Sequence, residues 1–170
     1  MKVLRDGAIR LGAAVALLVG ATGGAQAQDV TLKFHHFLGP KAPAHTRMIE
    51  PWAKRIEEES KGRIKVEIYP AMALGGKPPQ LIRQLRDGVV DVIWTVLGYT
   101  AGQFPRTEVF ELPFVHTNDA VATNLAMRDL FDQYLADEFK DVKVIVLHVH
   151  AGQAIHMVDT PVHTADDLKG

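Results

Sequence analysis

Histidines are the residues of this chain best suited to chemistry, because an imidazole can ligate a metal ion or carry a proton near neutral pH. Eight occur in 170 residues. His148 and His150 would share one face of an extended strand and could begin a zinc site, with His156 and His163 following. The spacing lacks the acidic partners of a metal centre, and the surrounding stretch is apolar. This pattern favours a structural role and predicts no metal site.

His35 and His36 are adjacent, so on a strand they would point to opposite faces and would make a poor chelating pair. One of them, at the mouth of a pocket, could instead donate a hydrogen bond to a carboxylate. The chain has no cysteine, which excludes a cysteine nucleophile, a thiolate zinc site and a cysteine-ligated cluster.

No motif of a known enzyme class stands out. There is no G-x-S-x-G, and Gly75-Gly76-Lys77 is followed by Pro78, so it lacks the spacing of a phosphate loop. The net charge is −1 with charges interspersed, which gives no footprint for nucleic acid. We therefore expect a protein that is not an enzyme and needs no cofactor. An exported metal-ion receptor and an exported α/β hydrolase are the alternatives, to be tested by chelator sensitivity and by turnover.

The first 27 residues are typical of a secretory signal peptide. A positively charged start precedes an apolar run over 11–19, and small residues then end in Ala25-Gln26-Ala27. The apolar run is shorter than the roughly 20 residues that span a membrane. We expect cleavage after Ala27 and export to the periplasm.

Alternating strand and helix patterns follow. Strands are predicted over 30–37, 64–69, 89–97 and 142–149. Amphipathic helices are expected to start near Glu50 and Pro78, and a longer one to run over about 118–139. The buried side of the long helix is predicted to consist of Val121, Leu125, Leu130, Phe131, Tyr134 and Leu135. This order predicts an α/β fold with a mostly parallel sheet.

Five stretches carry a resemblance to a known family: LKFHHFLGP, IEEESKGRIKVEIYPAMALGG, QLRDGVVDVIW, VFELPF and TPVHTADDLKG. In this order and spacing, the chain resembles the solute-binding proteins of TRAP (tripartite ATP-independent periplasmic) transporters, the DctP family. The resemblance implies a two-lobe α/β fold like that of type II periplasmic binding proteins, about twice as long as this chain. Residues 28–150 would form the first lobe. Residues 151–170 would form the hinge crossing and the truncated start of the second.

The resemblance also implies a function. Such a receptor captures a small organic acid and delivers it to the small and large membrane subunits of a TRAP permease. The arginine that pairs with the ligand carboxylate in the family is expected beyond residue 170, so residues 28–170 alone should not bind the acid tightly. Open α/β sheets bind ligands at the carboxyl ends of their strands. The expected ligand contacts are therefore His36, Phe37, Thr95, Val96, Gly98, Tyr99, His150 and Gln153.

Three positions bear on the ligand. Family members that bind sugar acids carry polar or acidic groups near Phe37 and Val96 and a further arginine near Ala154. This chain is apolar at all three positions. We therefore expect an organic acid with an apolar or aromatic body.

Overall fold

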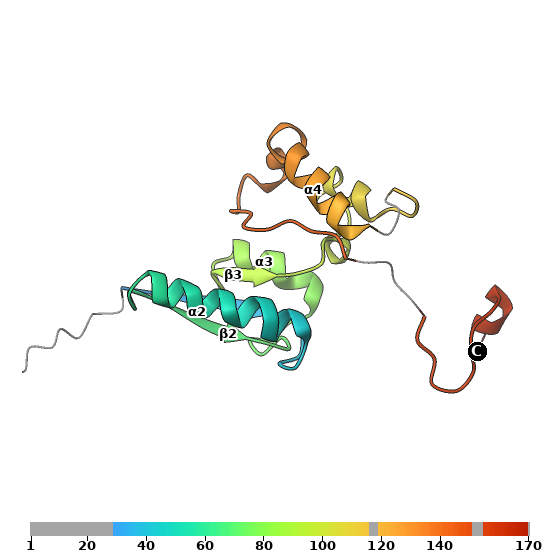
Figure 1. Cartoon of the computed structure of the whole chain (residues 1–170), viewed down its shortest axis with the longest axis horizontal. Coiled ribbons are helices and arrows are strands. Elements are labelled where there is room, and N and C mark those ends of the chain that lie inside the picture. The colour runs from blue at the N-terminus through green and yellow to red at the C-terminus, as the bar shows by residue number, and fades with distance from the viewer. Residues whose placement is uncertain (1–28, 116–118, 151–154, 170) are drawn as a thin grey trace, which may run out of the picture. The chain divides into compact units, whose positions relative to one another are not determined.

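A computed structural model describes residues 29–115, 119–150 and 155–169 (Figure 1). It divides into two compact units, Met1–Trp94 and Thr95–Gly170. The predicted signal peptide and the first four residues of the predicted hinge crossing, 151–154, lie outside the described residues, so the expected lobe boundary stays a prediction. Among the residues that the structure describes, no helix is long and apolar enough to span a membrane.

The first unit is built around a three-stranded parallel sheet. Its strand order is β2–β1–β3. β1 (Val30–His36) pairs with β2 (Ile64–Tyr69) on one side and with β3 (Val92–Trp94) on the other, both in parallel. Parallel neighbours need long crossover connections, and helices α2 (Glu50–Glu59) and α3 (Leu81–Arg86) supply them. The parallel α/β arrangement expected from the sequence is confirmed.

The first crossover contains η1 (His45–Ile49), a π-helical turn, and α2 (Glu50–Glu59). Pro51 is the second residue of α2 and directly follows the π-helical turn η1. The helix ends at Ser60, and Gly62 then takes a φ of +77°, a conformation that favours glycine.

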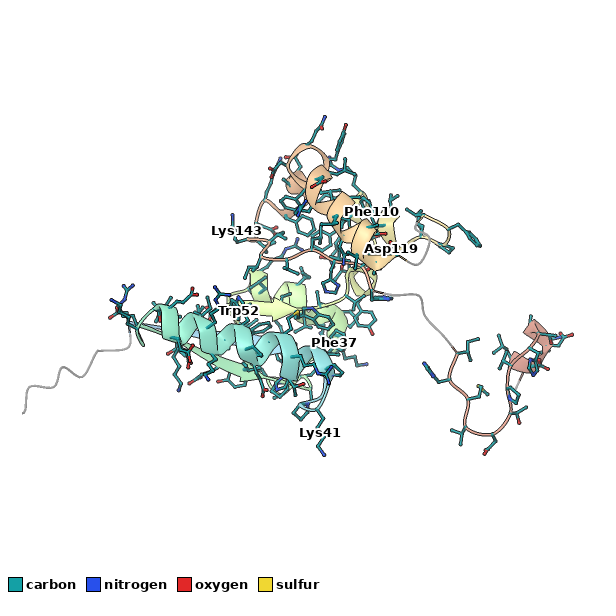
Figure 2. The ribbon with its side chains drawn as sticks, in the orientation of Figure 1. Phe37, Lys41, Trp52, Phe110, Asp119 and Lys143 are labelled. Carbon is teal, nitrogen blue, oxygen red and sulfur yellow. The ribbon has the colours of Figure 1, made fainter. Side chains whose placement is uncertain are left out.

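The core of the first unit lies between α2 and the sheet. Phe34, Ile49, Ala53 and Val66 are buried together. Trp52, labelled in Figure 2, packs edge-on against Phe34 with their ring centroids 5.6 Å apart. The second crossover contains η2 (Pro78–Gln80) and the short α3 (Leu81–Arg86), whose Leu81 and Ile82 are buried.

Short helical elements dominate the described part of the second unit. They are η3 (Leu97–Thr100), η4 (Thr107–Glu111), α4 (Ala120–Leu130), η5 (Phe131–Leu135), η6 (Ala136–Phe139) and η7 (Ala165–Leu168). The predicted long helix thus changes to π-helical and then 3₁₀ turns after Leu130. Within this unit, Phe104 stacks on Phe139 with ring centroids 4.6 Å apart.

The predicted buried side of the long helix is largely wrong. Val121, Leu125, Leu130 and Tyr134 are exposed. Of the predicted residues Leu135 is buried and Phe131 is half-buried, and the other buried residues of this stretch are Thr123, Met127 and Phe139. The buried side is the one that includes Phe139, because the Phe139 ring stacks on Phe104. The spacing of apolar residues in the helix does not reveal this partner.

Two strand predictions also need correction. The run 89–97 forms a strand only over Val92–Trp94, because the Val89 amide closes the turn after α3 by donating to the Gln84 carbonyl oxygen at 3.0 Å. The run 142–149 is not a strand in the structure. An extended segment becomes a strand only when a neighbouring backbone takes its hydrogen bonds. Here the amide of Val149 donates to the side-chain oxygen of Asn124 at 2.7 Å instead.

Candidate functional site

The predicted ligand residues are distributed over both units. His36 is the last residue of β1, and Phe37 follows it. Thr95 comes directly after β3 and begins the second unit. The other described positions in the second unit are Val96, Gly98, Tyr99 and His150, whereas Gln153 lies outside the described residues.

His36 belongs to a buried chain of three side chains. Its imidazole has no exposed surface, and its Nε2 lies 2.9 Å from Nδ1 of His45. The Nε2 of His45 lies 3.1 Å from Oε1 of Glu50. The His45 side chain is 6% exposed, and that of Glu50 is 53% exposed, so the chain runs from the buried end of β1 to water.

A π-helical turn makes this chain possible. His45 and Glu50 are five residues apart, and an α-helix of 3.6 residues per turn would place them on different faces. In η1 the amide of Glu50 donates to the carbonyl oxygen of His45. This i to i+5 bond widens the turn and brings the two side chains to the same side.

The environment of His36 disfavours its charged form. Burial, followed by the nearby imidazoles of His45 and His35, lowers the pKa of His36 from about 6.5 to about 4. His36 is therefore neutral at physiological pH. Its Nδ1 is buried and has no hydrogen-bond partner in the described structure.

His35 has a different role. Its Nδ1 lies 2.8 Å from Oε1 of Gln84, and the amide of Leu74 donates to its Nε2 at 3.4 Å. Nε2 must then be the acceptor and Nδ1 the protonated nitrogen. Both ring nitrogens of His35 are satisfied inside the first unit, so His35 ties the β3 crossover to β1. Of the two adjacent histidines, His36 is the one with an unused nitrogen.

Phe37 forms an aromatic pair with Trp94 at the same end of the sheet. Their ring centroids are 5.3 Å apart at an interplanar angle of 33°. Both side chains are half-buried, and Trp94 also packs against the core of the first unit. Phe37 is labelled in Figure 2. An aromatic surface of this kind suits the ring of an apolar ligand.

In the second unit, the hydroxyl of Thr95 is buried without a hydrogen-bond partner in the described structure. A β-carbon at Gly98 would meet the carboxylate of Glu111, so a larger residue at this position would require the Glu111 side chain to move. Tyr99 is 45% exposed, Val96 is half-buried, and His150 is exposed.

Three residues of these sites were not predicted from the sequence: His45, Glu50 and Glu111. The spacing of His45 and Glu50 matches no ordinary helical period. The signal that could have found them is a histidine one π-helical turn before a Glu-Pro helix start. Within the described residues, no group of three or more histidine, aspartate or glutamate side chains is arranged to hold a metal ion.

Comparisons with known proteins agree with the α/β fold and with the expected family. The family model described as bacterial extracellular solute-binding protein, family 7 (DctP), matches residues 34–170. A TRAP solute-binding protein from a marine metagenome, specific for aromatic acid ligands and solved with 3-hydroxybenzoate, is 48% identical, with a TM-score of 0.75. That match covers 85% of this chain and 45% of the solved one.

A TRAP solute-binding protein from Rhodoferax ferrireducens T118, solved with copurified benzoate, is 51% identical with a TM-score of 0.73. The match covers 82% of this chain and 43% of that one. Among curated proteins, the outer membrane transporter protein TsaT of Comamonas testosteroni is 28% identical over 157 residues, which are 91% of this chain and 46% of TsaT. The chain thus spans less than half the length of each of these relatives. It belongs to the DctP family, the bacterial extracellular solute-binding proteins of family 7.

Proposed function

We propose that this chain is part of a periplasmic receptor that captures an aromatic carboxylate and delivers it to the small and large membrane subunits of a TRAP transporter. The observation that carries this proposal is the identity of about half to two proteins solved with 3-hydroxybenzoate and benzoate. The receptor binds and releases its ligand unchanged, as expected in a family of solute-binding proteins. The same comparisons favour this role over the metal-receptor and hydrolase alternatives.

The side chains at the end of the sheet support an aromatic ligand. The Phe37–Trp94 pair offers ring surface on which a benzoate ring could stack. A sugar acid would place hydroxyl groups against these rings, and each hydroxyl buried without a partner costs about 1–3 kcal/mol. The apolar side chain of Val96 fits the same preference.

A calorimetric screen tests the proposal. The protein is expressed from its complete gene without residues 1–27 and titrated with 3-hydroxybenzoate, benzoate, glucuronate and a C4-dicarboxylate. We expect the two aromatic acids to bind at least a hundredfold more tightly than glucuronate. Tight binding of glucuronate with silent aromatic acids would overturn the proposal.

A pair of variants connects the ligand class to the ring pair. Phe37→Ala is expected to weaken 3-hydroxybenzoate binding by about tenfold, since one aromatic stacking contact is worth about 0.5–1.5 kcal/mol beyond its buried area. Tyr134→Ala removes an exposed aromatic side chain from η5 and is the matched control, with no expected effect. Equal affinities of both variants would show that Phe37 does not contact the ligand.

Export is part of the proposal. The secretory pattern of residues 1–27 and the family assignment both support a periplasmic location. Mass spectrometry of the periplasmic fraction should find a mature N-terminus at Gln28. An uncleaved protein in the membrane fraction would contradict the proposed export route.

A further inference from the structure

The unused nitrogen of His36 is the feature that the proposed function leaves unexplained. The ring is fully buried, yet its Nδ1 has no partner among the described residues. Native proteins rarely leave a buried polar atom unpaired without a ligand, an ion or a water to complete it. What Nδ1 can bind depends on whether it carries a proton.

The contacts with His45 and Glu50 fix that proton. An ionised carboxylate can only accept, so Nε2 of His45 donates to Glu50. When His45 is neutral, its Nδ1 is an acceptor, and the Nε2–H of His36 donates to it. The neutral His36 ring then has a bare Nδ1, which would repel a ligand carboxylate.

One added proton reverses this arrangement without moving any heavy atom. If His45 carries a proton on both nitrogens, its Nδ1 donates to Nε2 of His36, which becomes the acceptor. The remaining proton of the neutral His36 ring is then on Nδ1, where it can donate to a carboxylate. The positive charge resides on His45 beside Glu50, whose half-exposed carboxylate connects the chain to solvent.

We infer that the His36–His45–Glu50 chain couples ligand capture to the uptake of one proton: the ligand carboxylate binds the Nδ1–H of His36, and His45 holds the added charge. The inference rests on the proposed function, because it requires a carboxylate ligand. The proton balance is complete, since the three side chains gain a proton from water and His36 remains neutral. His36 is the ligand contact, and His45 and Glu50 are positioning residues.

Few other titratable groups face His36. On its own strand the neighbour is His35, whose two nitrogens are already bonded. Strands β2 and β3 pair with this end of β1 through Tyr69 and Trp94. Of these two only Tyr69 ionises, and its hydroxyl donates to Oε2 of Glu67 at 2.9 Å. The hydrogen bonds of His35 and Tyr69 thus go to side chains and backbone outside the three-residue chain.

Benzoate is the suitable probe, because it offers a carboxylate and no hydroxyl that could donate to a bare Nδ1. The protein expressed from its complete gene without residues 1–27 is titrated with benzoate at about pH 8 in phosphate and in Tris, which differ in ionisation enthalpy. The difference in heat gives the number of protons taken up. We expect an uptake close to one proton, and an affinity that falls about tenfold per pH unit above that pH.

Variants that keep the fold can test the coupling between benzoate binding and proton uptake. Glu50→Gln removes the charge that stabilises the His45 cation and changes a half-exposed side chain, so the fold should persist. This variant is expected to abolish proton uptake and to weaken the binding of benzoate at least tenfold at about pH 8. Glu58→Gln, on the same helix and paired only at the surface with Lys54, is the matched control and should behave as the native protein. His36→Phe should lose both the uptake and the pH dependence of binding.

The outcomes distinguish the two proposals. Benzoate binding with no proton uptake and with unchanged affinity in Glu50→Gln overturns the coupling and leaves the receptor function intact. If neither benzoate nor 3-hydroxybenzoate binds the native protein between about pH 6 and pH 8, the aromatic-acid function itself fails, and the coupling fails with it.

Discussion

Replacing Glu138 by alanine is expected to loosen the described part of the second unit at the start of η4. The Glu138 side chain is 5% exposed and lies 31 residues from the backbone that it binds. Its carboxylate accepts from the amides of Arg106 at 2.7 Å and Thr107 at 3.0 Å, and from the Thr107 hydroxyl at 2.7 Å. One buried carboxylate thus satisfies three donors at a helix N-terminus.

The magnitude follows from these contacts. Hydrogen bonds to a charged group contribute about 1.5–3 kcal/mol each, but water can reach part of this site once the side chain is gone. We expect Glu138→Ala to lower the local free energy of opening by about 3 kcal/mol. Glutamine keeps only one acceptor oxygen, so Glu138→Gln should cost about 2 kcal/mol.

The pH dependence has a defined sign. Burial acts to raise the pKa of Glu138, but hydrogen bonds from Arg106 and Thr107 and the nearby Arg106 guanidinium lower it more in sum. The folded pKa therefore lies below the unfolded value of about 4.3. The stabilisation by Glu138 is complete above that value and is lost as the pH falls through the folded pKa.

Amide hydrogen exchange measures the effect directly. Protection of the Arg106 and Thr107 amides should fall about a hundredfold in Glu138→Ala, since 1.4 kcal/mol corresponds to a factor of about ten. Asp137→Asn is the matched control, because Asp137 is an exposed neighbour paired only with Lys140. Indistinguishable protection in the two variants would refute the reasoning.

Two further predictions concern a titrating and a capping residue. Lowering the pH from about 8 to about 5 should decrease the free energy of unfolding of the first unit by about 2 kcal/mol. The stabilisation by neutral His36 is complete above the unfolded pKa of about 6.5, and it is lost as the pH falls toward the folded pKa of about 4. Both tryptophans lie in this unit, so fluorescence-monitored urea unfolding measures it, and a pH slope that persists in His36→Phe would contradict it. Asp119 accepts from the Ala122 amide at 2.9 Å and caps α4, so Asp119→Ala should cost about 1 kcal/mol and Asp119→Asn almost nothing. Exchange of the Ala122 amide tests this, and equal protection in the alanine and asparagine variants would exclude the cap.

Local patterns were sufficient to predict the first two strands. Alternation over 30–37 and 64–69 corresponds closely to β1 and β2, although three consecutive residues at the end of β1, Phe34, His35 and His36, are all buried. The run 142–149 is as apolar as a strand but is not one, since its backbone has no ladder in the described structure. An apolar pattern in the sequence predicts that a segment is buried. It does not predict whether a neighbouring strand will be present to pair with the backbone of that segment.

The sequence pattern also identified only some residues of the candidate site. The end of β1 directed attention to His36 and Phe37, and the structure adds an unpaired nitrogen to one and an aromatic partner to the other. His45 and Glu50 could not be found in this way, because only a π-helical turn places residues five apart side by side. Propensity for such a turn is not visible in composition or period.

The central position of β1 has a consequence for the timing of folding. β1 comes first in the chain, but its neighbours come later: Val30 pairs with Ile64, and His36 pairs with Trp94. Neither pairing can form until tens of further residues have been synthesised, and closing such long loops is slow. The backbone pairing of His36 with Trp94 therefore forms only after β3 exists. Until β3 has been made, one edge of β1 lacks its partner, so an incomplete chain presents an open strand edge to which another chain can pair.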